Sequence, residues 1–257
     1  MKQLRLLLIF IILGLRINAQ NKLSFSFDVS PTLSYRNYKL IDYSQGNSIF
    51  PSGKFYYNKF RNLYDSIESP KYGFQISLNL SYNISNKFSI LAGIQYKNIG
   101  TRYDITPLLA VFHYNETANY IFGEKPVIVY SKFHYIGIPV SLQYKVCSFN
   151  KLNILINAGS TIDFLISHEE GSELKTNPYT SQIANASDYS KVAININGGI
   201  KFSYPMNNHW DIDIMPLYTQ YVTPNVKINL YTSDDLFLKF NQFNYHWTLK
   251  FEIKYRI

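Results

Sequence analysis

The feature that most constrains this chain is a strict alternation of apolar and polar residues, which recurs in eight separate segments. In residues 245–257, the final segment, apolar residues occupy every odd position and polar residues every even position. The other segments are residues 23–35, 72–84, 88–96, 136–146, 154–164, 192–202 and 210–214; the last of these loses the pattern at Met215-Pro216, where we expect an interruption. A period of two residues is typical of a β-strand with one apolar face. The eight segments together predict an all-β fold.

The composition is consistent with one folded β-domain. Of the 257 residues, 46% are apolar and only 16% are charged, which excludes a disordered chain. Aromatic residues make up 17% of the chain, with 23 Tyr and 18 Phe, and this excess favours strands over helices. Cys147 is the only cysteine, so no disulfide can form within the chain.

The connections between the eight segments alternate in length. Residues 85–87, 147–152 and 205–209 form short connections, whereas residues 37–71, 104–129, 167–189 and 223–238 form long ones. An up-and-down antiparallel meander that closes on itself places odd and even connections at opposite ends. Outer-membrane barrels have this asymmetry, with short periplasmic turns and long extracellular loops. We therefore expect an eight-stranded antiparallel transmembrane β-barrel.

A soluble barrel or sandwich would also alternate, with its apolar residues inside. Large apolar side chains from eight strands would overfill a narrow lumen, however. The polar faces hold mainly Ser, Asn, Gly, Gln and Thr, which suits a hydrogen-bonded interior better than a water-exposed surface. Aromatic residues also gather at the strand ends, as in the interfacial girdles of membrane barrels. These residues are Phe25, Tyr35, Tyr72, Tyr82, Phe88, Tyr96, Tyr144, Phe164, Phe202, Tyr204, Tyr245 and Tyr255.

The first nineteen residues are typical of a secretory signal peptide. Lys2 and Arg5 precede an apolar run from Leu6 to Leu15, and Ala19 provides a small residue for cleavage. The expected organisation is a signal peptide over residues 1–19 and an outer-membrane barrel domain over residues 20–257. Cleavage would lower the formal charge from +8 to +5. We expect localisation in the outer membrane, with membrane lipid as a partner and no nucleic acid.

The polar faces carry charges of both signs, which we expect to point into the lumen and to pair, because an isolated buried charge is costly. Asp211 and Asp213 would lie opposite the basic run from Lys250 to Arg256. Such pairing would close the pore, and the alternative is a small-solute channel. The charged residues are Asp28, Lys97, Lys145, Asp163, Lys201, Asp211, Asp213, Lys250, Glu252, Lys254 and Arg256.

No motif assigns a catalytic, cofactor-binding or metal-binding residue. His246 and Thr248 share one face of the last segment and are reminiscent of a lipid-acting barrel enzyme, but a nucleophile also needs a base that a third group orients. The five histidines lack paired metal-ligand spacing. We expect no cofactor, no metal and no enzymatic activity, with a lipid-acting enzyme as the weaker alternative.

One segment resembles a known family. Residues 135–144, Tyr-Ile-Gly-Ile-Pro-Val-Ser-Leu-Gln-Tyr, are similar to a strand motif of PorT-like outer-membrane β-barrel proteins of Bacteroidetes, as are the glycine-containing stretches 91–100 and 198–202. The chain departs from many outer-membrane barrels in ending with Ile257 rather than Phe or Trp. The resemblance implies an envelope protein, in some members an accessory to secretion or gliding, and assigns no catalytic residue.

The first long connection supports an interaction role. It combines six aromatic residues, among them Phe55 and Tyr64, with Lys54, Lys59 and Arg61, and such mixtures suit contact with a protein or a glycan. Functional residues also concentrate on loops that a rigid scaffold holds. We expect a structural or interaction protein, monomeric, that contacts envelope proteins or glycans through its extracellular loops.

Overall fold

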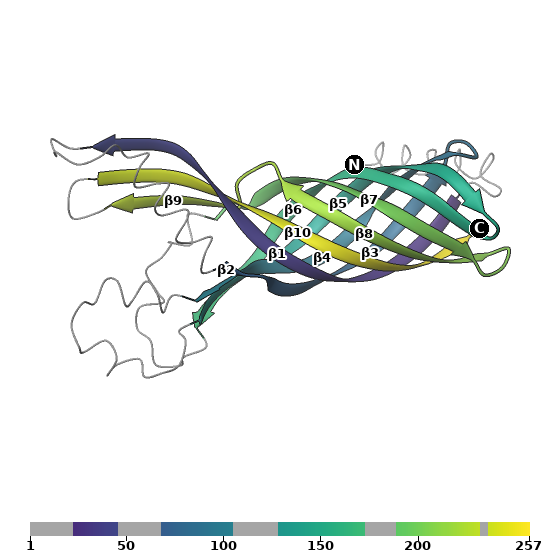
Figure 1. Ribbon diagram of the computed structural model, residues 1–257, viewed down its shortest axis with the longest axis horizontal. Helices are drawn as coiled ribbons and strands as arrows, with labels where there is room; N and C mark the ends of the chain where they lie inside the picture. Colours follow the sequence, from purple (N-terminus) through teal and green to yellow (C-terminus); the bar gives the residue numbers. More distant parts are fainter. Residues whose placement is uncertain (1–22, 46–67, 105–127, 173–188, 232–235) are drawn as a thin grey trace, which may run out of the picture.

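The computed structural model describes residues 23–45, 68–104, 128–172, 189–231 and 236–257. The expected signal peptide and the aromatic part of the first long connection lie outside these residues. The described chain forms ten strands (Figure 1), which are β1 (Leu23–Gln45), β2 (Glu68–Ser69), β3 (Lys71–Asn83), β4 (Phe88–Asp104), β5 (Ile128–Phe149), β6 (Leu152–Ser172), β7 (Val192–Pro205), β8 (Trp210–Tyr221), β9 (Val226–Tyr231) and β10 (Leu236–Arg256). Within the described ranges, no helix has the length and apolar character to cross a membrane.

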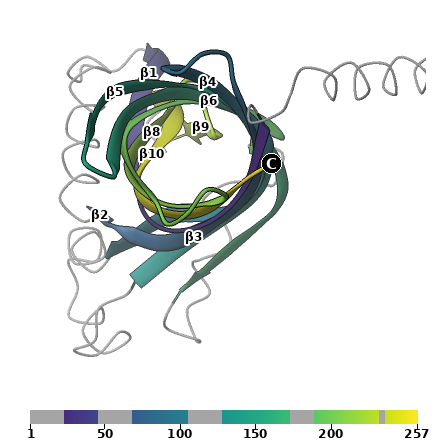
Figure 2. The same cartoon turned by 90° about the vertical axis from the view of Figure 1, so that its right-hand side faces the viewer.

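Eight of the strands form a closed antiparallel ring. Neighbours pair in the order β1, β3, β4, β5, β6, β7, β8, β10, and β1 then pairs with β10 to close the sheet, as the end-on view shows (Figure 2). At this seam, Ser24 lies opposite Arg256 and Tyr35 lies opposite Tyr245. The short strands β2 and β9 add to β4 and β10 at one end. The expected eight-stranded up-and-down barrel is confirmed.

Turn chemistry explains the short connections at the other end. In the β3–β4 turn, the Ser85 hydroxyl accepts a hydrogen bond from the backbone N–H of Phe88 at 3.1 Å. In the β7–β8 turn, the Asn207 side chain accepts hydrogen bonds from the backbone N–H groups of His209 and Trp210. Asn150, in the β5–β6 turn, has a φ of 53°, a left-handed conformation that asparagine tolerates. We call this the short-turn end and the opposite one the long-loop end.

The expected interruption at Met215-Pro216 is wrong, because β8 continues through both residues to Tyr221. Pro216 faces outward and lies opposite Leu249 of β10. On its β7 side, the paired register breaks between Gly199–Leu217 and Phe202–Ile214. Proline has no N–H to donate, so the strand accommodates it by giving up local pairing with one neighbour.

Apolar side chains cover the outside of the ring and polar ones fill the inside. Ile138 is 49% exposed, whereas Gln143, on the opposite face of the same strand, is 2% exposed. Aromatic rings form a belt at each edge of the outer apolar band: Phe88 with Tyr144 and Trp210 with Tyr255 near the short-turn end, and Tyr35 with Tyr245, Tyr218 with Trp247 and Phe74 with Tyr96 near the long-loop end. This inverted arrangement excludes the soluble barrel.

The strands are longer than the alternation predicts. β1 reaches Gln45, β5 begins at Ile128, and β6 ends at Ser172, so the barrel wall continues well past the apolar band at the long-loop end (Figure 1). There β1, β10 and β9 project together beyond the ring. The long connections are correspondingly shorter than expected.

Candidate functional site in the barrel lumen

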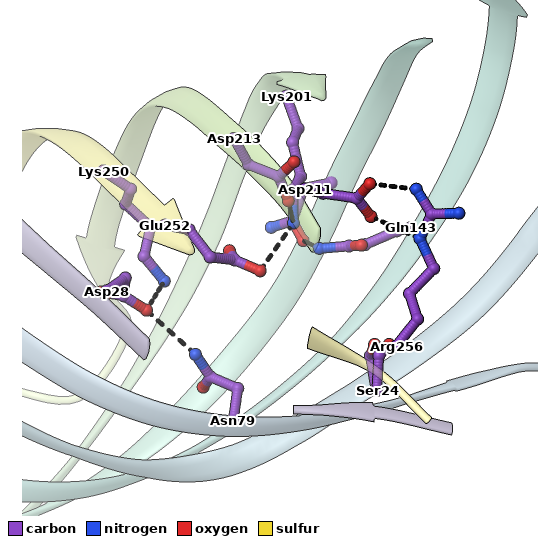
Figure 3. Close-up of polar contacts among 12 residues, drawn as sticks. Ser24, Asp28, Asn79, Gln143, Lys201, Asp211, Asp213, Lys250, Glu252 and Arg256 are labelled. Carbon is purple, nitrogen blue, oxygen red and sulfur yellow. Dashed lines mark hydrogen bonds and ion pairs between the residues drawn. The ribbon is translucent and has the colours of Figure 1, made fainter. Parts of the chain in front are cut away.

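Ion pairs between different strands fill the half of the lumen near the short-turn end. The ammonium of Lys201 on β7 lies 2.6 Å from a carboxylate oxygen of Asp213 on β8 and 2.9 Å from one of Glu252 on β10 (Figure 3). All three side chains are almost completely buried. One lysine therefore holds together two carboxylates that lie opposite each other on β8 and β10 and would otherwise repel each other.

A second ion pair spans the seam between β1 and β10. Lys250 lies 2.9 Å from Asp28, whose side chain is fully buried (Figure 3). Asp28 also accepts hydrogen bonds from the Asn79 amide at 2.9 Å and the Ser77 hydroxyl at 3.1 Å. The two neighbouring strands, β3 and β10, therefore supply donors to this one carboxylate, as the burial of a charge requires.

Asp163 on β6 is the centre of the third buried cluster. Its Oδ2 accepts hydrogen bonds from Lys97 at 2.8 Å, from the Asn195 amide at 2.7 Å and from the Tyr221 hydroxyl at 2.7 Å. Gly137 of β5 faces it closely, since a Cβ at that position would come within 2.3 Å of Asp163 Oδ1. The glycine of the Tyr135–Tyr144 motif thus leaves room for the carboxylate.

Most of the charges that the sequence places inside the barrel form pairs, which confirms that expectation. Asp211 lies opposite Lys254 and forms its ion pair with Arg256, and Asp213 lies opposite Glu252 but takes its cation from Lys201 on β7. Lys145 and Lys254 have no carboxylate within ion-pair distance in the part of the chain that the structure describes. Two of the eleven inward charges thus remain as free lysines near the short-turn end.

Aromatic residues fill the lumen toward the long-loop end, and the alternation pattern did not predict them. The ring of Phe133 lies 5.6 Å from that of Tyr189, and the ring of Tyr135 lies 6.1 Å from that of Tyr221. The Asn225 amide donates a hydrogen bond to the Tyr135 hydroxyl at 3.1 Å. We call Phe133, Tyr135, Tyr189 and Tyr221 the aromatic plug; all four are buried.

The described side chains leave little open space at the centre of the lumen. The cavity there has a volume of about 30 Å³, with room for roughly one or two water molecules. Leu91, Met215 and Leu217 contribute apolar surface to its wall. These three residues lie on the inward face of their strands, where most other residues are polar.

A larger cavity opens at the short-turn end. It has a volume of about 930 Å³, and its lining is mainly polar and includes Lys87, Lys145, Lys254 and Arg256. Asp211 is the one carboxylate side chain among the lining residues. Lys201, Asp213 and Glu252 do not line this cavity, but each lies two residues from a lining residue on its own strand.

The His246–Thr248 pair lies inside the lumen, away from lipid. Both residues are buried, at 1% and 4% exposure. Among the described residues, the two nitrogens of the His246 ring have no hydrogen-bond partner, and the Thr248 hydroxyl has none either. The geometry therefore lacks the hydrogen bond from nucleophile to base that covalent catalysis needs.

The remaining histidines make local contacts. His134 accepts or donates a hydrogen bond with the Tyr96 hydroxyl at 2.6 Å, and the His168 ring lies 4.0 Å from that of Tyr189. Across the described ranges, no three His, Cys, Asp or Glu side chains lie close enough together to hold a metal ion. His113 lies outside these ranges.

Comparisons with known proteins found similar solved structures and one matching family model. Neisserial surface protein A is 14% identical, with 91% of this chain and 97% of that chain covered and a TM-score of 0.41. OprG from Pseudomonas aeruginosa is 10% identical, with 93% and 98% covered and a TM-score of 0.49. No curated protein matches the sequence. The model of the outer membrane protein beta-barrel domain family matches residues 18–257, so this chain belongs to that family of outer-membrane barrels.

Proposed function

We propose that this barrel is a closed scaffold in the outer membrane, with a structural or interaction role that its long connections carry out. The filled lumen is the observation that carries the proposal. Three buried clusters of ion pairs and the aromatic plug leave a central cavity of only about 30 Å³ among the described side chains. A solute larger than one or two water molecules would not fit through this part of the lumen.

Opening such a lumen would be costly. An ion that passes the centre would have to separate Lys201 from Asp213 and Glu252, and breaking a buried ion pair costs about 3–5 kcal/mol. It would then have to displace the rings of Phe133 and Tyr221. The small-solute channel is therefore the less favoured function.

Single-channel recording in planar bilayers tests the closed lumen. The purified barrel should give no steady current, and the variant Phe133→Ser with Tyr221→Ser should give at most brief openings, because the ion pairs remain. A steady open-state current from the unmodified protein would favour the channel and overturn the scaffold.

The interaction role belongs to the long-loop end, which we place outside the cell, with the short turns in the periplasm. The aromatic and basic composition of residues 46–67 supports contact with envelope proteins or glycans. Replacing this segment with a glycine-serine linker of equal length should abolish cross-linking to partners in intact outer membranes without unfolding the barrel. The same replacement of residues 105–127 is the matched control, and equal loss from both would argue against a specific role for the first segment.

The PorT-like resemblance of residues 135–144 suggests the finer role of an accessory to secretion or gliding in Bacteroidetes. A deletion strain should then lose secretion or gliding and regain it when the gene is restored. Normal secretion and gliding in that strain would leave the scaffold in place but remove the accessory role.

The remaining proposals concern processing, chemistry and assembly. We propose cleavage after Ala19, a monomeric state, and no enzymatic activity or cofactor. The lumenal position of His246 supports the absence of lipid chemistry, since a lipid would have to enter the barrel to reach it. A lipid-deacylating activity that is lost in His246→Ala while the barrel stays folded would overturn this proposal.

A further inference from the structure

The cavity at the short-turn end, which we call the mouth, has lysines on opposite walls. Lys145 lies on β5 and Lys254 on β10, two strands that are four places apart in the eight-strand ring, and both residues line the mouth. Lys87, in the β3–β4 turn, also lines it, and its carbonyl accepts a hydrogen bond from the backbone N–H of Lys145 at 2.7 Å. Positive charge therefore faces the mouth from both sides.

These lysines differ from the lysines deeper in the lumen. The buried residues Lys97, Lys201 and Lys250 each have a carboxylate within 2.9 Å. Among the described residues, Lys145 and Lys254 have no carboxylate within ion-pair distance, although both are only partly exposed. The barrel thus pairs its cations in the interior and leaves cations without carboxylates at the mouth.

The other charges of the mouth do not cancel these lysines. Arg256 is a fourth lining cation, but it is ion-paired with Asp211. The final residue, Ile257, also lines the mouth, so its carboxylate adds one more negative charge. Four cations therefore face two carboxylates among the described lining residues. A cleft with one excess sign of charge and low-dielectric walls attracts ions of the opposite sign.

The mouth has the size and the closed inner end of a small-molecule site. Its volume of about 930 Å³ is within the range of roughly 300–1,000 Å³ that such sites have. Inward of it lie the Lys201 ion pairs and the central cavity of only about 30 Å³. The uncharged polar lining can form hydrogen bonds with a ligand. It consists of Asn83, Ser85, Asn86, Ser89, Asn153, Ser203 and Asn208.

We propose that the mouth binds a small soluble molecule with two or more anionic groups, phosphate or carboxylate. One group pairs with Lys145 and Lys87, and another pairs with Lys254 on the opposite wall. Lysine binds both kinds of group as a point charge, so phosphate and carboxylate share this recognition chemistry. A ligand with a single charge could not reach both walls equally well. The site goes beyond the scaffold role, and only its opening into the periplasm rests on the proposed orientation.

Isothermal titration calorimetry of the full barrel in detergent micelles tests this site at an ionic strength fixed with sodium chloride. Fructose bisphosphate and citrate are the anionic probes, and fructose is the neutral comparison. At least one anion should bind, and fructose should not. Lys145→Gln and Lys254→Gln should each weaken anion binding roughly tenfold, which corresponds to the loss of one charge-assisted hydrogen bond. Lys39→Gln with Lys227→Gln removes two exposed lysines at the long-loop end and should leave the affinity unchanged.

The relative affinity of the two anions decides between phosphate and carboxylate. The proposal is wrong if neither anion binds, if fructose binds as tightly as fructose bisphosphate, if the Lys145→Gln/Lys254→Gln variant keeps full affinity, or if the control variant loses as much. Binding of a penta-aspartate peptide, with neither small anion bound, would assign the mouth to an acidic protein segment instead. Heat-modifiable gel mobility of each variant separates loss of binding from loss of folding. Bilayer recording of the closed lumen is a separate readout, so the two proposals can fail independently.

Discussion

The two halves of strand β5 carry opposite patterns. Near the short-turn end, Ile138 and Val140 face outward while Ser141 and Gln143 face the lumen. Toward the long-loop end, the outward residues become polar, as at Lys132, and the inward residues become apolar or aromatic. The strand keeps its period of two throughout, but the chemistry of its two faces is exchanged between Tyr135 and Ile136.

The surrounding medium explains this exchange. We call the part of the barrel that carries the apolar band the lower barrel and the part beyond it, at the long-loop end, the upper barrel. Hydrocarbon outside the lower barrel favours apolar exterior residues. The polar residues inside must therefore form hydrogen bonds and ion pairs with one another, as they do in the Asp28, Asp163 and Lys201 clusters. Beyond the bilayer the barrel wall faces water. The apolar side chains there therefore point inward, and Phe133 packs against Tyr189 as residues do in the core of a soluble β-protein. One continuous sheet thus has two kinds of core.

The largest expected effect concerns the polar core. Lys201→Met leaves Asp213 and Glu252 buried without their shared cation and should lower the free energy of unfolding by about 3–5 kcal/mol. Urea unfolding in lipid vesicles measures this. Adding Asp213→Asn and Glu252→Gln should restore much of the loss; if Lys201→Met alone is neutral, the ion pairs do not stabilise the lower barrel.

The aromatic core should respond like the interior of a soluble protein. Phe133→Ala removes a ring that packs against Tyr135 and Tyr189 and should cost about 3 kcal/mol. The same urea titration measures it, with the exposed Phe149→Ala as the control. A loss no larger than that of the control would mean that the aromatic plug is not a packed core.

The boundary between the halves can be located with a single charge. Ile138→Lys, in the middle of the apolar band, should destabilise the barrel by about 2–4 kcal/mol, whereas Tyr130→Lys, on the same face beyond the band, should cost about 0–1 kcal/mol. Unfolding of both variants from the same vesicles gives the comparison. Equal costs at the two positions would place the bilayer edge elsewhere.

The smallest effect is expected where a buried polar group lacks a partner. Thr248→Val replaces a hydroxyl that has no hydrogen bond among the described residues with a methyl group of similar size, and stability should change by less than about 1 kcal/mol. Ser77→Ala, which removes a hydrogen bond to Asp28, should cost more. The reverse order would indicate that Thr248 is the better satisfied of the two residues.

The lower barrel was predictable because one rule governs it. Alternation locates every strand, the connection lengths establish the closed meander, and opposite charges on inward positions anticipate the buried pairs. The pattern could not predict which strand supplies each ion-pair partner. Asp213 on β8 takes its cation from Lys201 on β7, and this pairing depends on the register between the two strands.

The upper barrel was not predicted, for a physical reason. Alternation with apolar residues outside holds only where hydrocarbon surrounds the wall, so an apolar residue on an inward position marks the limit of that pattern and not the end of the strand. The signal was present as a change in the phase of the apolar residues. On β5 the adjacent residues Tyr135 and Ile136 are both apolar, and on β4 the spacing from Tyr96 to Ile99 is three residues instead of two. The fully buried Ile99 and Phe133 are the residues on the shifted phase.

Quenching by brominated lipids tests the two-core account most directly. In a Cys147→Ser background, single cysteines at positions 130, 138 and 141 would each carry a small fluorophore, and the barrel would be folded into vesicles with bromine on the acyl chains. The account predicts strong quenching at position 138 and weak quenching at positions 130 and 141. Strong quenching at 141, or at 130 as much as at 138, would contradict it.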